Sequence, residues 1–134
     1  MDMMEQDDVV NYWVETANSD FRTMLNMYES KDYHWSLFMG HLVIEKLLKA
    51  IYVKKHGEHP PKTHDLLRLA KEAEVQTTEE QMDVLDLATT FNINARYPDY
   101  KRSFYKKCTQ EFTAANIEKI KELRTWLLSL IKNK

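Results

Sequence analysis

Apolar side chains recur at spacings of three and four residues along most of this 134-residue chain, which is the period of an amphipathic α-helix. The pattern predicts helices over residues 8–28, 33–55, 66–74, 77–91 and 112–131, the third being short. Two glycines and three prolines are too few for a β-rich or disordered chain. The fold class predicted from the sequence is therefore all-α, in a single domain.

The second predicted helix is apolar around most of its circumference between Leu37 and Tyr52, so it is expected to be the most buried. Gly40 lies in its middle and costs ~1 kcal/mol relative to alanine, which favours a close approach of another helix there. Gly57 is expected to end this helix. Thr63 is the expected N-cap of the third helix. Overlapping capping-box patterns at Thr77 and Thr78 predict the start of the fourth.

An irregular segment is expected from residue 92 to about 108. Pro98 disfavours helix at Tyr97 and removes a backbone donor. The segment carries five cations and one acid beside several aromatic rings: Arg96, Lys101, Arg102, Lys106, Lys107, Asp99, Tyr97, Tyr100, Phe104 and Tyr105. These side chains either bind a phosphate and stack on a base, or form a solvated loop whose rings rest on the core. The residues alone leave both interpretations open.

A second candidate lies on the second predicted helix, where His41, Glu45 and Lys49 follow one another at four-residue intervals and so share one face. One interpretation is a polar stripe that faces a cleft or a dimer partner. The other is an ordinary surface stripe, in which Glu45 and Lys49 form an ion pair that stabilises the helix by ~0.3–0.5 kcal/mol.

His56, His59 and His64 cluster around two consecutive prolines. No carboxylate or cysteine stands at a standard zinc spacing from them. We therefore predict a solvated loop and no metal site, although His64 is also placed to orient a phosphate or to fix the connector.

The composition narrows the classes of function. A formal net charge of −2 gives no global attraction to nucleic acid, so an anion site must be local. Cys108 is the only cysteine, which excludes an intramolecular disulfide and suits the cytoplasm. No apolar run reaches the ~18–20 residues of a membrane span. There is no glycine-rich phosphate loop and no standard enzyme motif, so no cofactor is predicted.

Three stretches together resemble the HEPN domain family, the higher eukaryotes and prokaryotes nucleotide-binding domain. They are residues 41–50 on the second helix, 61–66 before the third, and 95–99 after the fourth. The resemblance extends over about residues 9–131. It implies an antiparallel up-and-down bundle of four main helices plus a short extra one, often a homodimer. These three stretches and the basic run after them together give the candidate site, which contains Arg96, Tyr97, Asp99, Lys101, Arg102, His41, Glu45, Lys49 and His64.

Many HEPN proteins pair with a minimal nucleotidyltransferase, and others are ribonucleases, many of them toxins. The ribonucleases carry an arginine, a polar neighbour, and a histidine four to six residues further on. Here Tyr97 follows Arg96, and positions 101–103 hold no histidine, so the side chain best suited to move a proton near neutral pH is missing. The resemblance thus favours a non-catalytic domain that binds a nucleotide or nucleic-acid phosphate. A divergent ribonuclease using Arg96 at a dimer cleft and a structural interaction module are the alternatives.

Overall fold

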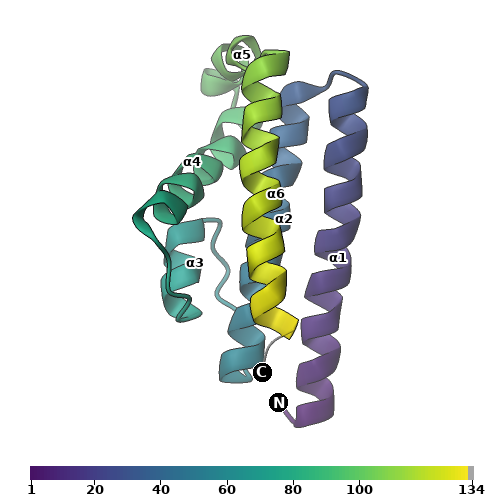
Figure 1. The fold of residues 1–134 in the computed structure, drawn as a ribbon, viewed down its shortest axis with the longest axis vertical. Coiled ribbons are helices and arrows are strands. Elements are labelled where there is room, and N and C mark those ends of the chain that lie inside the picture. The colour runs from purple at the N-terminus through teal and green to yellow at the C-terminus, as the bar shows by residue number, and fades with distance from the viewer. Residues whose placement is uncertain (133–134) are drawn as a thin grey trace.

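The structure is a computed structural model that describes residues 1–132, and within them it contains helices and no strand. The helices are α1 (Met3–Glu29), α2 (Tyr33–His56), α3 (Leu66–Glu72), α4 (Glu79–Arg96), α5 (Pro98–Lys107) and α6 (Gln110–Lys132). In Figure 1 the chain ascends along α1, descends along α2, ascends along α4 and descends along α6. The all-α prediction is confirmed. None of the described helices combines the length and apolar character that a membrane span requires.

Helix α2 is the centre of the molecule and contacts each of the other five helices. Its side chains are buried at most positions from Leu37 to Val53, as the all-round apolar pattern predicted. At Gly40, side chains from α6 and α1 come close to the backbone of α2. A methyl group there would overlap the side chain of Ile120 and lie 3.2 Å from Met24 Sδ. The missing side chain at Gly40 therefore permits the packing of α2 between these two neighbours.

The helix ends follow local sequence signals, with one exception. The Thr78 hydroxyl accepts from Gln81 N at 3.1 Å, and Gln81 returns the bond by accepting from Thr78 N at 2.9 Å, which is the predicted capping box. Gly57 ends α2 with φ +64°, a conformation that favours glycine. The prediction that Thr63 is the N-cap of α3 was wrong. The N-cap is Asp65, whose side chain accepts from Arg68 N at 3.2 Å.

Helix α1 begins five residues earlier than its apolar pattern indicated, with Asp2 as N-cap. The added turn brings Gln6 to the C-terminal end of α2. Gln6 Nε2 donates to the carbonyl oxygens of Val53 and Lys54, at 2.9 Å each. These belong to the last turn of α2, where Gly57 N also donates to Val53 O at 2.8 Å. The first turns of α1 therefore cap the C-terminus of α2.

The expected irregular segment from 92 to 108 is wrong, because α4 continues to Arg96 and α5 follows after a single break. Tyr97 alone is extended, with φ −90° and ψ 129°. Proline lacks a backbone donor, but the first helical position needs none, so Pro98 begins α5 instead of preventing it. Phe104 is 4 % exposed and stacks on Phe91 with ring centroids 5.8 Å apart, which attaches the polar helix α5 to the core.

Candidate functional site

A surface hollow of about 600 Å³ lies between the start of α2, the end of α4 and helix α5. We call it the cationic groove. Its lining consists of one histidine, two other aromatic side chains and three cations: His34, Trp35, Tyr105, Arg96, Lys101 and Arg102. Segments that are far apart in the sequence therefore build one concave surface, which requires the break at Tyr97 to turn α5 back toward α2.

The cations of the cationic groove contact aromatic and backbone groups. Lys101 Nζ lies 5.0 Å from the Trp35 ring centroid, and the Arg96 guanidinium lies 5.6 Å from the ring of Tyr97. Arg96 Nε also donates to its own helix, to Asn92 O at 3.4 Å. Among residues 1–132, none of the three lining cations is paired with a carboxylate. Their charge is therefore available to an anion that enters the groove.

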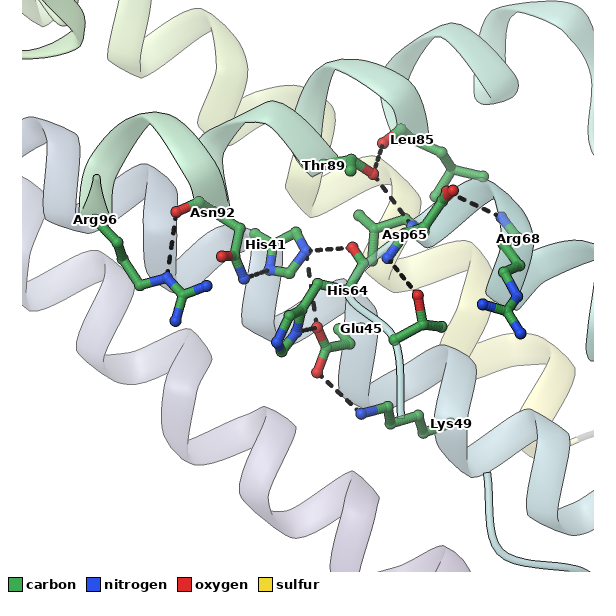
Figure 2. A network of polar contacts seen from close by, with 12 residues as sticks. His41, Glu45, Lys49, His64, Asp65, Arg68, Leu85, Thr89, Asn92 and Arg96 are labelled. Carbon is green, nitrogen blue, oxygen red and sulfur yellow. Dashed lines mark hydrogen bonds and ion pairs between the residues drawn. The ribbon is translucent and has the colours of Figure 1, made fainter. Parts of the chain in front are cut away.

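A second polar assembly lies along α2, and Figure 2 shows it from close by. We call it the polar network, and its members are His41, Glu45, Lys49, His64 and Asn92. His41 is fully buried, while Glu45 is 4 % and Lys49 9 % exposed. The surface-stripe interpretation is therefore wrong as to exposure, although its ion pair between Glu45 and Lys49 is present. Glu45 accepts from Lys49 Nζ at 3.1 Å and from His64 Nδ1 at 2.7 Å, so its buried charge is compensated on both oxygens.

The hydrogen bonds of His41 determine its protonation state. Its Nε2 lies 2.9 Å from the carbonyl oxygen of His64, so Nε2 carries the proton and donates. Its Nδ1 lies 3.3 Å from Asn92 Nδ2 and accepts. Burial lowers the pKa of His41, and its backbone bond to His64 and the Glu45 charge only partly oppose this. His41 is therefore a neutral link between α2, α4 and the connector before α3.

His64 differs from the other members of the polar network because its side chain is 58 % exposed. Its Nδ1 donates to the buried carboxylate of Glu45. In a neutral imidazole the other nitrogen then carries the lone pair, so Nε2 is the acceptor nitrogen of this largely exposed side chain. The network also reaches the cationic groove: Asn92 contacts His41 through its side chain and accepts from Arg96 through its backbone oxygen.

The structure divides the predicted site residues between these two places. Arg96, Lys101 and Arg102 line the cationic groove, whereas His41, Glu45, Lys49 and His64 form the polar network. Tyr97 and Asp99 are exposed and do not line the groove. The proposed stacking role of Phe104 is wrong, because that ring is buried against Phe91. Within residues 1–132 no cluster of histidine, cysteine, aspartate and glutamate is placed to hold a metal ion.

Sequence reasoning missed several residues that the fold brings into these places. His34 and Trp35 enter the groove from the first turn of α2, and Asn92 enters the network from α4. Nothing local marks these positions, because each gains its partners only when distant helices pack. Only one feature of the sequence pointed to Tyr105 as a site residue, namely its position among the cations of the basic run.

Comparisons with known proteins agree with this fold. A crystal structure of TT1696 from Thermus thermophilus has a similar fold, with a TM-score of 0.78 and 18% sequence identity, covering 90% of this chain and 97% of that one. No curated protein matches the chain at a significant level. The family model described as HEPN domain matches residues 10–131. Since that match extends over nearly the whole chain, the protein belongs to the HEPN domain family.

Proposed function

We propose that this HEPN domain binds a nucleotide or a nucleic-acid phosphate in the cationic groove and does not cleave it. The observation that supports the proposal is the groove itself, where Arg96, Lys101 and Arg102 lie beside two aromatic rings without a carboxylate partner among residues 1–132. Arginine engages a phosphate through two parallel hydrogen bonds. A base stacked on an aromatic ring contributes ~1–3 kcal/mol. The groove therefore contains both kinds of group that a nucleotide requires.

A titration with a fluorescently labelled single-stranded RNA tests this function. Arg96→Ala and Lys101→Ala should each weaken binding about tenfold, because each removes a charge-assisted contact. Lys119→Ala is the matched control, since Lys119 is an exposed lysine that lies outside the groove, on α6. Binding should also weaken with added salt, because phosphate contacts release counterions. Equal affinity in wild type and both groove variants would refute the site.

A second candidate function, RNA cleavage, is favoured by one contact. His64 Nδ1 donates to Glu45 Oε1 at 2.7 Å, and in a neutral imidazole with this bond the acceptor nitrogen is Nε2, on a side chain that is 58 % exposed. That is the kind of group the sequence lacks after Arg96, and a positioned base of this type removes the proton of a 2′-hydroxyl. The polar network also ends at Arg96, so both groups belong to one assembly in Figure 2.

Incubation of RNA with the protein in chelator separates the two candidates. The first predicts intact RNA at neutral pH with wild type and with every variant. The second predicts cleavage by wild type that disappears in both His64→Ala and Arg96→Ala. His59→Ala is the control, because His59 is an exposed histidine of the same connector. If no nucleotide or RNA binds or changes the melting temperature, a structural interaction module is the remaining interpretation.

The family membership supports further proposals about context. We propose that α1, α2, α4 and α6 form the antiparallel bundle of a single cytoplasmic domain, with a core over about residues 9–131, which carries α3 and α5. We also propose a homodimer, and a pairing with a minimal nucleotidyltransferase in a toxin–antitoxin-like or regulatory system. Sedimentation of the ~16 kDa chain at tens of micromolar tests the dimer, and co-purification with a nucleotidyltransferase encoded by the adjacent gene tests the pairing.

A further inference from the structure

Two cations of the cationic groove lie against aromatic rings, and those rings differ in position. The Arg96 guanidinium lies 5.6 Å from the ring centroid of Tyr97 and 5.9 Å from that of Phe38. Neither of these two residues lines the groove. The Lys101 ammonium lies over the ring of Trp35, 5.0 Å from its centroid, and Trp35 does line the groove. Lys101 therefore lies against part of the surface that a ligand would use.

Lys101 differs from the other neighbours of the Trp35 ring in where it comes from. The rings of His34 and Phe38 belong to α2, as Trp35 does, and their centroids lie 4.9 Å and 5.7 Å from that of Trp35. Lys101 belongs to α5 and is exposed. Within residues 1–132 its ammonium has no carboxylate partner. Because a lysine ammonium is carried on a flexible four-carbon stem, Lys101 can leave the ring without the movement of a helix.

The contact between Lys101 and Trp35 affects charged and uncharged ligands differently. The ammonium is attracted by the negative face of the indole. A base that stacks on the same face must displace the ammonium, and an uncharged ligand supplies no new partner for it. A phosphate does supply one, since a charge-assisted hydrogen bond is among the stronger polar contacts of proteins. Stacking on Trp35 is therefore coupled to the presence of an anion in the groove.

We propose that Lys101 determines which class of ligand the groove accepts. By covering Trp35 it excludes uncharged bases and nucleosides, and it admits ligands whose phosphate draws the ammonium off the ring. The inference rests on the proposed function above. Arg96 has no such role, because the rings against its guanidinium lie outside the groove, where a bound base does not compete for them. Arg96 is therefore the matched control.

The experiment compares two single-stranded oligonucleotides of the same sequence and sugar, one with phosphodiester linkages and one with uncharged methylphosphonate linkages. Wild type should bind the charged ligand at least about tenfold more tightly. Lys101→Ala should weaken the charged ligand about tenfold, because a phosphate contact is lost. The same substitution should strengthen the uncharged ligand about two- to fivefold, because the cation–π contact no longer has to be broken. Arg96→Ala should weaken the charged ligand as well, without strengthening the uncharged one.

Proton NMR observes the movement of Lys101 in the wild-type protein. In the free protein its ε-methylene protons lie near the Trp35 ring, so the ring current should shift them upfield of those of Lys119, an exposed lysine on α6. The Lys101→Ala spectrum assigns the shifted signal by its absence. Saturation with the charged oligonucleotide should return the signal to the ordinary lysine position.

The outcomes separate this inference from the function on which it rests. Three results would overturn the inference alone: equal affinity of wild type for the two ligands, no gain of affinity for the uncharged ligand in Lys101→Ala, or an upfield shift that persists in the charged complex. No binding of the charged ligand by wild type, or unchanged binding of it by both Arg96→Ala and Lys101→Ala, would overturn the proposed function of the groove, and the inference with it.

Discussion

The polar network and the cationic groove both contain histidine and cationic side chains, but they differ in how those cations are paired. In the polar network, Glu45 is compensated by Lys49 and His64, and both nitrogens of His41 are bonded, while Asn92 Oδ1 has no partner within residues 1–132. In the groove, the cations have no carboxylate partner within residues 1–132, and His34 Nδ1 is unpaired. Removing one partner of a buried pair lowers stability, whereas an exposed cation without a carboxylate partner is available to an anion. Substitutions should therefore affect folding at one place and binding at the other.

The largest change in the free energy of unfolding is expected from a substitution at Glu45. Glu45→Ala removes the partner of Lys49, whose side chain is 11 % exposed, and breaking a buried pair in this way costs ~3–5 kcal/mol of the free energy of unfolding. Urea denaturation measures it. Glu118→Ala is the control, because it breaks the exposed pair with Lys121 and should cost at most ~0.5 kcal/mol. A loss below about 1 kcal/mol at Glu45 would mean that the network does not support the fold.

The reverse result is expected in the groove. Arg102→Ala removes an exposed cation that lines the cationic groove, so RNA affinity should fall about tenfold. The free energy of unfolding should change by less than about 0.5 kcal/mol, as for most surface substitutions. Fluorescence anisotropy and urea denaturation of the same preparation measure both quantities. A variant that loses stability and keeps its affinity would contradict the distinction between the two places.

A smaller effect concerns pH. Burial lowers the pKa of His41 below its ordinary value of 6.5, so the unfolded chain binds a proton at a pH where the folded chain does not. The free energy of unfolding should therefore decrease as the pH falls below about 6.5, by at most ~1.4 kcal/mol per pH unit for one such group. His41→Gln should flatten this dependence between about pH 7.5 and 5.5. His59→Gln, at an exposed connector position, should leave it unchanged.

The smallest effect tests the boundary between the groove and the core. Cys108 lines a second, smaller hollow next to His34 but is only 5 % exposed, and burial raises the pKa of its thiol to about 11. At pH 8 only about one thiol in a thousand would then be ionised, so reaction with a maleimide should be much slower than for a small free thiol. A rate equal to that of the free thiol would show that this wall opens to solvent.

The sequence predicted the helices better than the sites, for a physical reason. The burial of α2 follows from a local pattern of apolar residues that surrounds most of the helix. The helix α5 was missed because Pro98 ends one helix and begins another with equal ease. Its composition is strongly polar, and Phe104 is the side chain that it contributes to the buried core.

The resemblance located Arg96, His41 and Glu45, but their assignment to a groove or to a network depends on packing. The partners of His34 and Asn92 come from helices that lie fifty or more residues away along the chain. No local spacing encodes such pairings. Only the assembled fold decides which polar groups meet and which remain available.

The contact from Gln6 to the last turn of α2 has a consequence for how the molecule opens. Gln6 donates hydrogen bonds to the carbonyl oxygens of Val53 and Lys54. Fraying of the first turns of α1 would therefore break these bonds and destabilise the C-terminal turn of α2. The connector that begins at Gly57 leads from there to His64. Amide exchange at the start of the chain and in this connector is then expected to occur in one shared opening event. A tag or fusion that unwinds the first turns would thus act at a distance on the position of His64.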